Sequence, residues 1–221
     1  MVDRQTTYVK TEGEQIPVVA DCDVVVVGAG PAGHAAAISA ARNGASVTLM
    51  ERYHHLGGMA SGGMVLVLDD MVNEGNEIVT TGIVSEFVER LEKQDAAVYP
   101  PKADHQTNWE MWQKWSRWGC IDFHKAMMPQ PIIHAVAFDP DAWKRVSLDM
   151  VRETDVNLRT HSWFSDVVRE GGKITGVIAQ TKLGRQVIRA KYVIDATGDL
   201  DVGVAAGADY TDGQFIVTTV F

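Results

Sequence analysis

Three glycines, Gly28, Gly30 and Gly33, stand in the segment DVVVVGAGPAG with the spacing of a phosphate-binding turn. The first permits a tight turn out of a strand, and the second lets the backbone approach a pyrophosphate. The third lets the following helix pack closely on the sheet. That helix begins at Pro31 and Ala32, where free N–H groups and a partial positive charge would face the phosphates. The spacing predicts a nucleotide-binding turn, although three glycines alone are weak evidence.

An acidic residue strengthens this prediction. Glu51 lies 23 residues after Gly28, at the end of the next apolar run. Its carboxylate can accept hydrogen bonds from ribose hydroxyls and would repel a 2′-phosphate, which disfavours NADP. The motif lies within a βαβ unit of about 30 residues, which consists of an apolar run, a glycine turn, an Ala-rich helical segment and a second apolar run. Nucleotide binding is therefore the function that this segment predicts most strongly.

Two later segments are also rich in glycine or end in a glycine turn. The segment HHLGGMASGGM, residues 54–64, is the most glycine-rich loop, and VIDATGDLD, residues 193–201, ends an apolar run in a Thr-Gly turn. A mobile surface turn is the alternative interpretation of the first segment.

Together, GAGPAG, the ER pair at Glu51–Arg52, LGGMASGGM and VIDATGDLD resemble the FAD-dependent oxidoreductases of the glutathione-reductase/fumarate-reductase-like superfamily. The resemblance is greatest to the bacterial branch, and it extends from about Asp23 to the end of the chain, through FDPDAWKRV. It implies FAD as cofactor and an enzyme that transfers hydride to or from a small organic substrate. A flavin ring needs close backbone approach and N–H donors, because negative charge grows on it during reduction. A Gly-Met-Ala-Ser-Gly-Gly loop can supply both.

The resemblance also assigns cofactor contacts. The three glycines of the first turn would face the pyrophosphate, Glu51 the adenosine ribose, and the backbone at Trp163 or Phe164 the adenine. The second glycine loop would run along the pyrophosphate and under the ribitol and flavin ring, and the Ala-Thr-Gly turn would close the pyrophosphate side. The residues expected to contact FAD are Gly28, Gly30, Pro31, Ala32, Gly33, Glu51, Arg52, Gly57, Gly58, Met59, Ser61, Gly62, Gly63, Phe164, Ala196, Thr197, Gly198 and Asp199.

The elements that must position these residues indicate an α/β fold: a Rossmann-like FAD-binding parallel sheet with an inserted antiparallel β-meander and a partial helical cap. Wholly apolar runs predict buried parallel strands, and a glycine pair at 171–172 predicts a hairpin. Amphipathic spacing predicts a helix within about 82–97, and Asp139–Pro140 opens another. The expected strands are Asp23–Val27, Ala45–Glu51, 156–162, Trp163–Arg169, Lys173–Gln180, Gln186–Ala190 and 192–199.

Four segments are expected along the chain. Residues 1–20 form an N-terminal arm, and residues 21–64 the βαβ FAD-binding core with its glycine-rich loop. Residues 65–150 form a helical, Trp-rich insertion. Residues 151–221 contain the third strand, the meander and the return to the FAD-binding sheet, which is incomplete at the C terminus.

Catalytic residues are not assigned by the sequence. It contains no Ser-His-Asp set, no H-x-x-E-H motif and no acidic cluster, so we expect neither hydrolytic chemistry nor a metal site. His54 and His55 precede the glycine loop and could contact the cofactor, but solvent-facing loop histidines are the preferred interpretation. His34 is expected on the helix surface. His124 and His134 flank KAMMPQP, which could line a pocket.

Four tryptophans three residues apart, at 109, 112, 115 and 118, would spread over about half the circumference of a helix. That arc is too wide for one core stripe. Core packing and a ligand- or partner-facing role are equally favoured for them.

Composition limits the partners. The formal charge of −9 argues against nucleic acid, and no run of roughly 18 or more apolar residues predicts a membrane span. Two cysteines, Cys22 and Cys120, suit a reducing cytoplasm and are expected to be packed side chains.

The resembled family is about twice as long as this chain, which stops within an apolar run at 213–221. We therefore expect a second polypeptide that completes the fold, with an experimental fragment as the alternative. Two other functions compete with the flavoenzyme: a non-catalytic nucleotide-binding assembly subunit, and a non-redox dinucleotide enzyme resembling thiazole synthase. Because no second G-x-G-x-x-G occurs, a built-in NAD(P)H domain is not expected.

Overall fold

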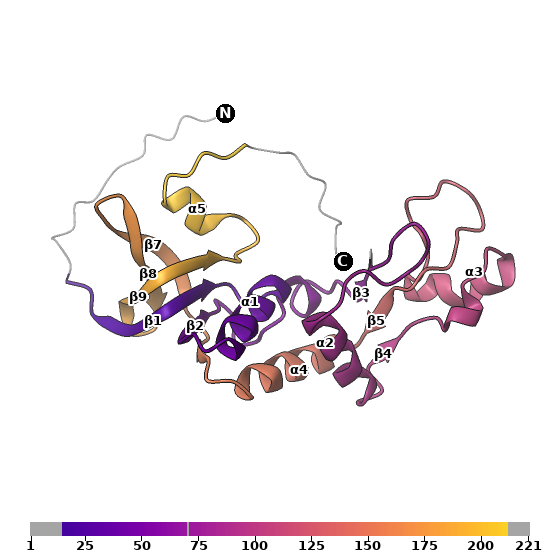
Figure 1. Cartoon of the computed structure of the whole chain (residues 1–221), viewed down its shortest axis with the longest axis horizontal. Coiled ribbons are helices and arrows are strands. Elements are labelled where there is room, and N and C mark those ends of the chain that lie inside the picture. Colours follow the sequence, from indigo (N-terminus) through magenta and orange to yellow (C-terminus); the bar gives the residue numbers. More distant parts are fainter. Residues whose placement is uncertain (1–14, 70, 212–221) are drawn as a thin grey trace, which may run out of the picture.

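The computed structural model describes residues 15–69 and 71–211, and its centre is a mixed sheet of six strands (Figure 1). The strand order is β6-β2-β1-β9-β8-β7. Residues 1–14 of the arm expected at 1–20, and the apolar run at 213–221, lie outside the described residues, and β1 begins within the last part of that arm, at Val18. The strands of this sheet are β1 (Val18–Val27), β2 (Val47–Met50), β6 (Asn157–Arg159), β7 (Trp163–Glu170), β8 (Lys173–Thr181) and β9 (Gly184–Asp195).

The first four strands of this order are parallel, and they confirm the predicted α/β class. β1 lies between β2 and β9, with Val27 opposite Met50 on one side and Asp195 on the other. β6 continues the sheet beyond β2. Because both faces of the sheet are covered there, Val24–Val27 of β1 form an unbroken apolar run and all four residues of β2 are buried. The carboxyl ends of β1, β2 and β9 therefore meet at one edge of the sheet.

The antiparallel meander is formed by β7, β8 and β9. We expected two strands at Gln186–Ala190 and 192–199, and this expectation was wrong: β9 is one continuous strand of 12 residues. No glycine or proline interrupts it, so it pairs with β8 through its first half and with β1 along most of its length. One strand thus joins the meander to the parallel sheet.

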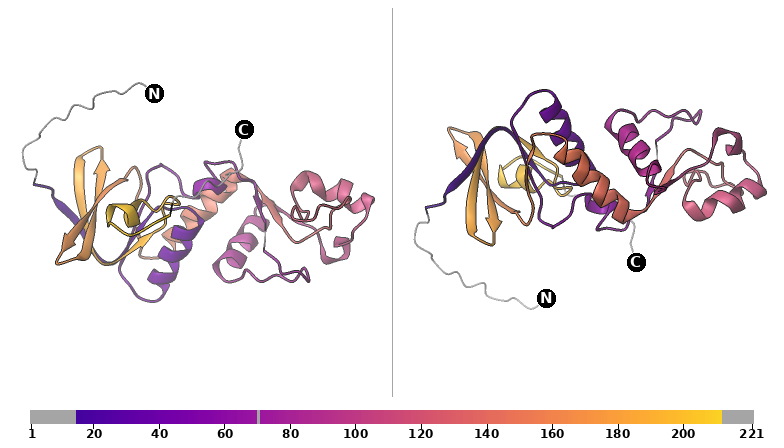
Figure 2. Two further views of the ribbon diagram at one scale, coloured as in Figure 1. Left: turned by 90° about the horizontal axis from the view of Figure 1, so that it is seen from above. Right: turned by 90° about the horizontal axis from the view of Figure 1, so that it is seen from below.

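Three helices, α1 (Pro31–Arg42), α2 (Ile83–Glu92) and α4 (Pro140–Arg152), contribute to one hydrophobic core with β1 and β2. The meander covers the opposite face through a second cluster, which includes Val25, Val27 and Ile188. Figure 2 shows the meander at one end of the molecule, the Trp-rich segment at the other end, and α4 between them.

The Trp-rich segment contains α3 (Trp109–Trp115) and one turn of 3₁₀ helix, and it packs beside a small antiparallel sheet. That sheet has the order β3 (Val67–Leu68), β5 (Val136–Phe138), β4 (Ala97–Val98). Trp115 is buried, whereas Trp109 and Trp118 are 54% and 40% exposed. The tryptophans therefore divide between core and surface. Within the described residues, no helix has the length and apolar character needed to cross a membrane.

Candidate cofactor site

Three loops that are distant in sequence meet at the carboxyl ends of β1 and β9. Backbone hydrogen bonds join them: the N–H of Ala196 donates to Val27 O at 2.9 Å, and the N–H of Gly57 donates to Ala29 O at 2.9 Å. The N–H of Gly28 donates to Met50 O at 2.9 Å. The first glycine turn is thus held by backbone hydrogen bonds to three segments: the end of β2, the second glycine loop and the turn after β9.

Steric contacts explain why glycine is needed in this group. A Cβ atom on Gly28 would lie 2.4 Å from the carbonyl oxygen of Ala196, and one on Gly33 would lie 1.8 Å from Gly28 O. A Cβ atom on Gly58 would lie 3.0 Å from the Cα atom of Gly30. By contrast, the nearest atom to a Cβ on Gly30 is 3.9 Å away. Gly28, Gly33 and Gly58 serve packing, and Gly30 keeps a space open beside the backbone.

The helix α1 points its N terminus at this space. Gly30 is its N-cap, Pro31 opens the first turn, and neither a side-chain cap nor an acidic residue satisfies the first turn. Pro31 and Ala32 are exposed. The free N–H groups and the helix dipole therefore form an anion site of the type that binds phosphate.

Glu51 is 5% exposed and lies directly against the turn. Its Oε2 atom accepts a hydrogen bond from the N–H of Ala29 at 2.8 Å, and Oε1 accepts one from the N–H of Tyr53 at 2.9 Å. A carboxylate has about four lone-pair sites, so it can still accept from the hydroxyls of a ribose. The guanidinium of Arg52 lies 4.9 Å from the ring centroid of Tyr53 and 5.5 Å from that of Trp163.

β7 comes to this position because the N–H of Ser162 donates to Glu51 O at 2.9 Å. The half-buried Phe164 follows two residues later in β7. The structure therefore brings the start of the meander next to Glu51 and Arg52. Arg52 and Trp163 are exposed at this edge, where an adenosine is expected.

The second glycine loop is compact. Gly58–Ala60 forms a 3₁₀ turn, and the N–H of Gly62 donates to Gly58 O at 2.9 Å. Ser61 is 2% exposed, and its hydroxyl donates to Leu56 O at 2.8 Å, so its side chain faces inward. Met59 is 49% exposed on the outside of the loop. The N–H of Ser61 also donates within the loop, to Gly58 O at 3.3 Å, so Ser61 supports the shape of the loop.

The Ala-Thr-Gly turn depends on a residue that the sequence did not single out, Asp195. Its Oδ1 atom accepts hydrogen bonds from the N–H and hydroxyl of Thr197, at 3.1 and 2.7 Å. Its Oδ2 atom accepts one from the N–H of Gly203 at 3.0 Å, in α5 (Asp201–Ala205). The Thr197 oxygen in turn accepts from the N–H groups of Asp199 and Asp201, at 3.4 and 3.1 Å.

Burial alone would raise the pKa of Asp195, but the hydrogen bonds from Thr197 and Gly203 outweigh it, so its pKa lies below 3.8. The carboxylate is therefore ionised near neutral pH and organises the turn. An acidic residue at the end of an apolar strand, directly before Ala-Thr-Gly, was the signal in the sequence. Gly198 and Asp199 lie exposed on this turn.

The histidines differ in their positions. His54 is exposed and His55 is half-buried, with Nδ1 3.2 Å from the Ser61 hydroxyl oxygen. His134 contacts Tyr99, with ring centroids 5.0 Å apart, beside the small sheet. The expectation of a surface position for His34 was wrong: it is 4% exposed, because α4 covers this face of α1. Cys22 and Cys120 are buried and unpaired, as predicted, and burial raises the pKa of Cys120 to about 11.

Comparison with known proteins places this site in a family. A family model described as FAD dependent oxidoreductase matches residues 23–216, so the chain belongs to that family, as the sequence motifs predicted. A segment of 38 residues is 60% identical to an uncharacterized protein in the nifH2 5′ region of Methanosarcina barkeri. This match covers 17% of this chain and 20% of that protein.

Two solved structures share the fold at low identity. THI4 of Thermovibrio ammonificans is 21% identical with a TM-score of 0.51, and the match covers 84% of this chain and 61% of that one. A geranylgeranyl bacteriochlorophyll reductase-like protein of Thermoplasma acidophilum is 21% identical with a TM-score of 0.52, and the match covers 85% and 42%. The chain thus spans less than two thirds of each of these proteins.

The residues present fit the FAD that the family implies. The open space at Gly30, the uncapped N terminus of α1 and the buried carboxylate of Glu51 match a pyrophosphate followed by a ribose. An acidic side chain at the ribose position does not suit a 2′-phosphate.

Proposed function

We propose that this chain holds FAD in a flavin-dependent oxidoreductase acting on a small organic substrate. The observation that supports this most directly is the convergence of Gly30, Gly58 and the Ala196 turn at the N terminus of α1, with Glu51 beside them. When bound, FAD supplies a flavin ring that accepts or donates hydride. The contacts of the 18 residues assigned above to the cofactor are part of this proposal.

The chain's own residues would act by binding and orientation. The N–H groups at the start of α1 hold the phosphates, and the carboxylate of Glu51 accepts from the ribose hydroxyls. Arg52, Trp163 and Phe164 border the adenine. The loop at 58–63 would lie along the flavin side, and the N–H groups of residues 60–63 hold its shape by donating to the carbonyl oxygens of Gly57 and Gly58.

A second polypeptide that completes the substrate side is also part of the proposal. A groove of about 600 Å³ opens on the small sheet, and apolar side chains of Leu66, Val98 and Trp118 are among those that line it. Apolar surface of this kind is typical of a substrate pocket or of an interface. The residues at 65–150 would then form the substrate-side insertion. Two unpaired cysteines support a reducing, cytoplasmic location.

The test is native mass spectrometry of the purified protein together with its absorption spectrum. FAD at one molecule per chain, with flavin absorption and a second polypeptide in the native mass, is the expected result. A colourless protein that takes up no FAD on addition would refute the flavin assignment, and would favour an assembly subunit. Bound FAD that dithionite reduces, but that no donor in a panel of small organic hydride donors reduces, would favour a non-redox role.

A further inference from the structure

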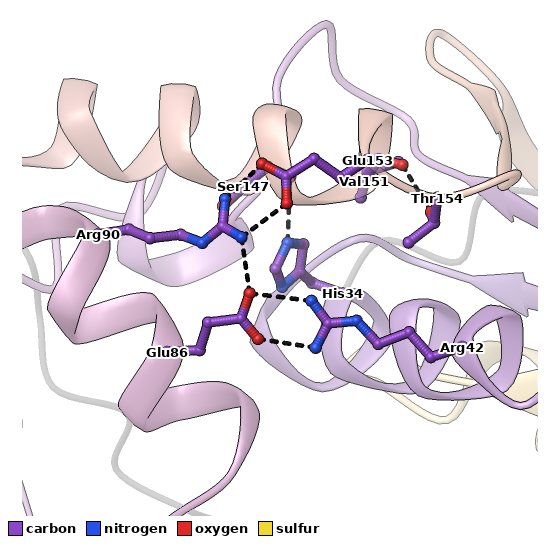
Figure 3. A network of polar contacts seen from close by, with 8 residues as sticks. All are labelled: His34, Arg42, Glu86, Arg90, Ser147, Val151, Glu153 and Thr154. Atoms are coloured by element: carbon purple, nitrogen blue, oxygen red, sulfur yellow. Dashed lines mark hydrogen bonds and ion pairs between the residues drawn. The ribbon is translucent and has the colours of Figure 1, made fainter.

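The side chain of His34 connects the pyrophosphate turn to α4. His34 follows Gly33 in α1, and its Nε2 atom lies 3.1 Å from the backbone carbonyl oxygen of Ser147 (Figure 3). A carbonyl oxygen can only accept, so Nε2 carries the proton and donates. The imidazole also meets the ring of Phe87 edge-on, with centroids 5.6 Å apart.

The helix α4 also supports the second glycine loop, through Trp143. A Cβ atom on Gly57 would lie 2.6 Å from Cδ1 and 2.8 Å from Nε1 of Trp143, so the indole packs directly against this glycine. Trp143 is 4% exposed, and its ring packs on those of Phe87 and Phe138 with centroids 4.3 and 4.4 Å apart. Phe87 therefore contacts both His34 and Trp143.

Trp143 and Ser147 are four residues apart, so they lie on the same face of α4. One helix face thus contacts Gly57 of the second glycine segment and the side chain of His34, the residue that follows the first glycine turn. An ion-pair network holds this helix in place. Arg42 of α1 contacts Glu86 of α2 at 2.7 Å, and Arg90 contacts Glu86 and Glu153 at 2.7 and 2.6 Å (Figure 3).

We propose that His34 and Trp143 are positioning residues for the cofactor: through α4 they fix the distance between the pyrophosphate turn and the second glycine loop. This inference rests on the proposed function, because it assigns the two turns to one ligand. Neither side chain needs to touch FAD. The hydrogen bond from His34 fixes the position of the first turn of α1 relative to α4, and the indole of Trp143 fixes the position of Gly57 relative to the same helix.

The environment of His34 keeps the imidazole neutral. Burial lowers its pKa from 6.5, and the nearby Arg42 acts in the same direction, whereas the Ser147 carbonyl and Glu86 raise it. Arg90 and Glu153 complete the charged groups that face this region from α2 and α4. Protonation in acid would leave the hydrogen bond from Nε2 in place but would bury a charge between α1 and α4, and so would oppose their close contact.

The experiment compares His34→Gln with His34→Leu in the purified full chain. The Gln amide nitrogen lies near the position of Nε2 and can donate to Ser147 O, whereas Leu has similar bulk and no donor. Ser39→Ala, on the exposed side of the same helix, is the matched control. Binding of FAD and of ADP is measured by calorimetry, and amide hydrogen exchange is followed at 28–34 and 57–63.

His34→Leu is expected to weaken FAD binding about tenfold and to speed exchange in both segments, because one buried hydrogen bond is lost. His34→Gln is expected to stay within about threefold of the wild type. Equal losses in both variants, or none in either, would overturn the positioning role. A wild-type chain that does not bind FAD would instead refute the proposed function, and the inference with it.

If His34→Leu does not fold, the pH profile of His34→Gln decides the question. Wild-type affinity for FAD should decline in acid, once the pH falls below the lowered pKa of His34, and that of His34→Gln should not, because only the imidazole gains a proton. Parallel profiles would refute the inference.

Discussion

The Glu51 carboxylate accepts a hydrogen bond from the backbone N–H of Ala29 at 2.8 Å, so the residue proposed to bind ribose also fixes the first glycine turn. Its second oxygen is bonded to the N–H of Tyr53. Cofactor recognition and turn geometry therefore depend on the same carboxylate. A substitution at this position should affect both.

Glu51→Gln tests this double role. An amide group turns one acceptor into a donor, which would face the N–H of Ala29 or Tyr53. We expect FAD affinity to fall at least about tenfold and the free energy of unfolding to fall by about 1–3 kcal/mol, because a buried polar group is left unsatisfied. Calorimetry and urea denaturation measure the two effects. Unchanged FAD affinity would show that the carboxylate does not bind the ribose.

Gly30→Ala and Gly33→Ala separate binding from folding. Gly30 has ordinary contacts and a φ of −66°, so alanine should leave the free energy of unfolding nearly unchanged. Its methyl group would occupy the space assigned to the pyrophosphate, and FAD affinity should fall more than about tenfold. At Gly33 the methyl group would overlap a backbone oxygen, so the expected loss is about 3 kcal/mol or more. Full FAD affinity in folded Gly30→Ala would contradict the site assignment.

Asp195→Asn tests the Ala-Thr-Gly turn. The amide nitrogen would face N–H donors on one side, so the unfolding free energy at pH 7 should fall by about 1–3 kcal/mol. Because the pKa of Asp195 is lower in the folded state than 3.8, its contribution is complete above pH 3.8 and is lost as the pH falls further. The difference between wild type and variant should therefore shrink in acid. A constant difference between pH 7 and pH 3 would argue against a role of the carboxylate charge.

Glu86→Gln tests the network between the helices. Hydrogen bonds from Arg42 are the largest cause that lowers the pKa of Glu86, to about 2. Its contribution to stability is present above pH 4.5 and is lost as the pH falls toward about 2. Because the pairs are partly exposed, we expect a loss of about 0.5–1 kcal/mol at pH 7, reduced in 1 M salt. Lys144→Gln, which removes an exposed pair within α4, should change the free energy less.

Local patterns predicted the parts of the fold that they encode. The apolar run before Gly28 and the run before Glu51 are the parallel strands β1 and β2, and Gly171–Gly172 is the turn between β7 and β8. The helix expected within 82–97 is α2, which ends at Glu92. Ala97 pairs with Phe138 in the small sheet and is therefore part of β4. The length of β9 is set by its pairing with distant strands, so local patterns predicted two short strands where the structure has one.

For the site, glycine spacing and Glu51 predicted the first turn, and the resemblance to the flavoenzyme superfamily implied that the second glycine loop and the Ala-Thr-Gly turn lie beside it, as the backbone hydrogen bonds show. The burial of His34 was not predictable, because the Ala-rich helix around it gives little amphipathic signal and its cover, α4, lies more than 100 residues later. The roles of Asp195 and Trp143 likewise depend on backbone atoms of other segments, which no spacing rule reveals.

The pairing of β1 with β9 has a consequence for synthesis of the protein. Val27 pairs with Asp195, so β1 remains an edge strand until β9 has left the ribosome. A nascent chain ending before β9 would carry the three glycines and Glu51, but it would expose the apolar side of Val25 and Val27 that the meander covers. Competence to bind a nucleotide therefore requires the synthesis of β9, and a premature stop in the meander should yield an aggregating product instead of a smaller binding module.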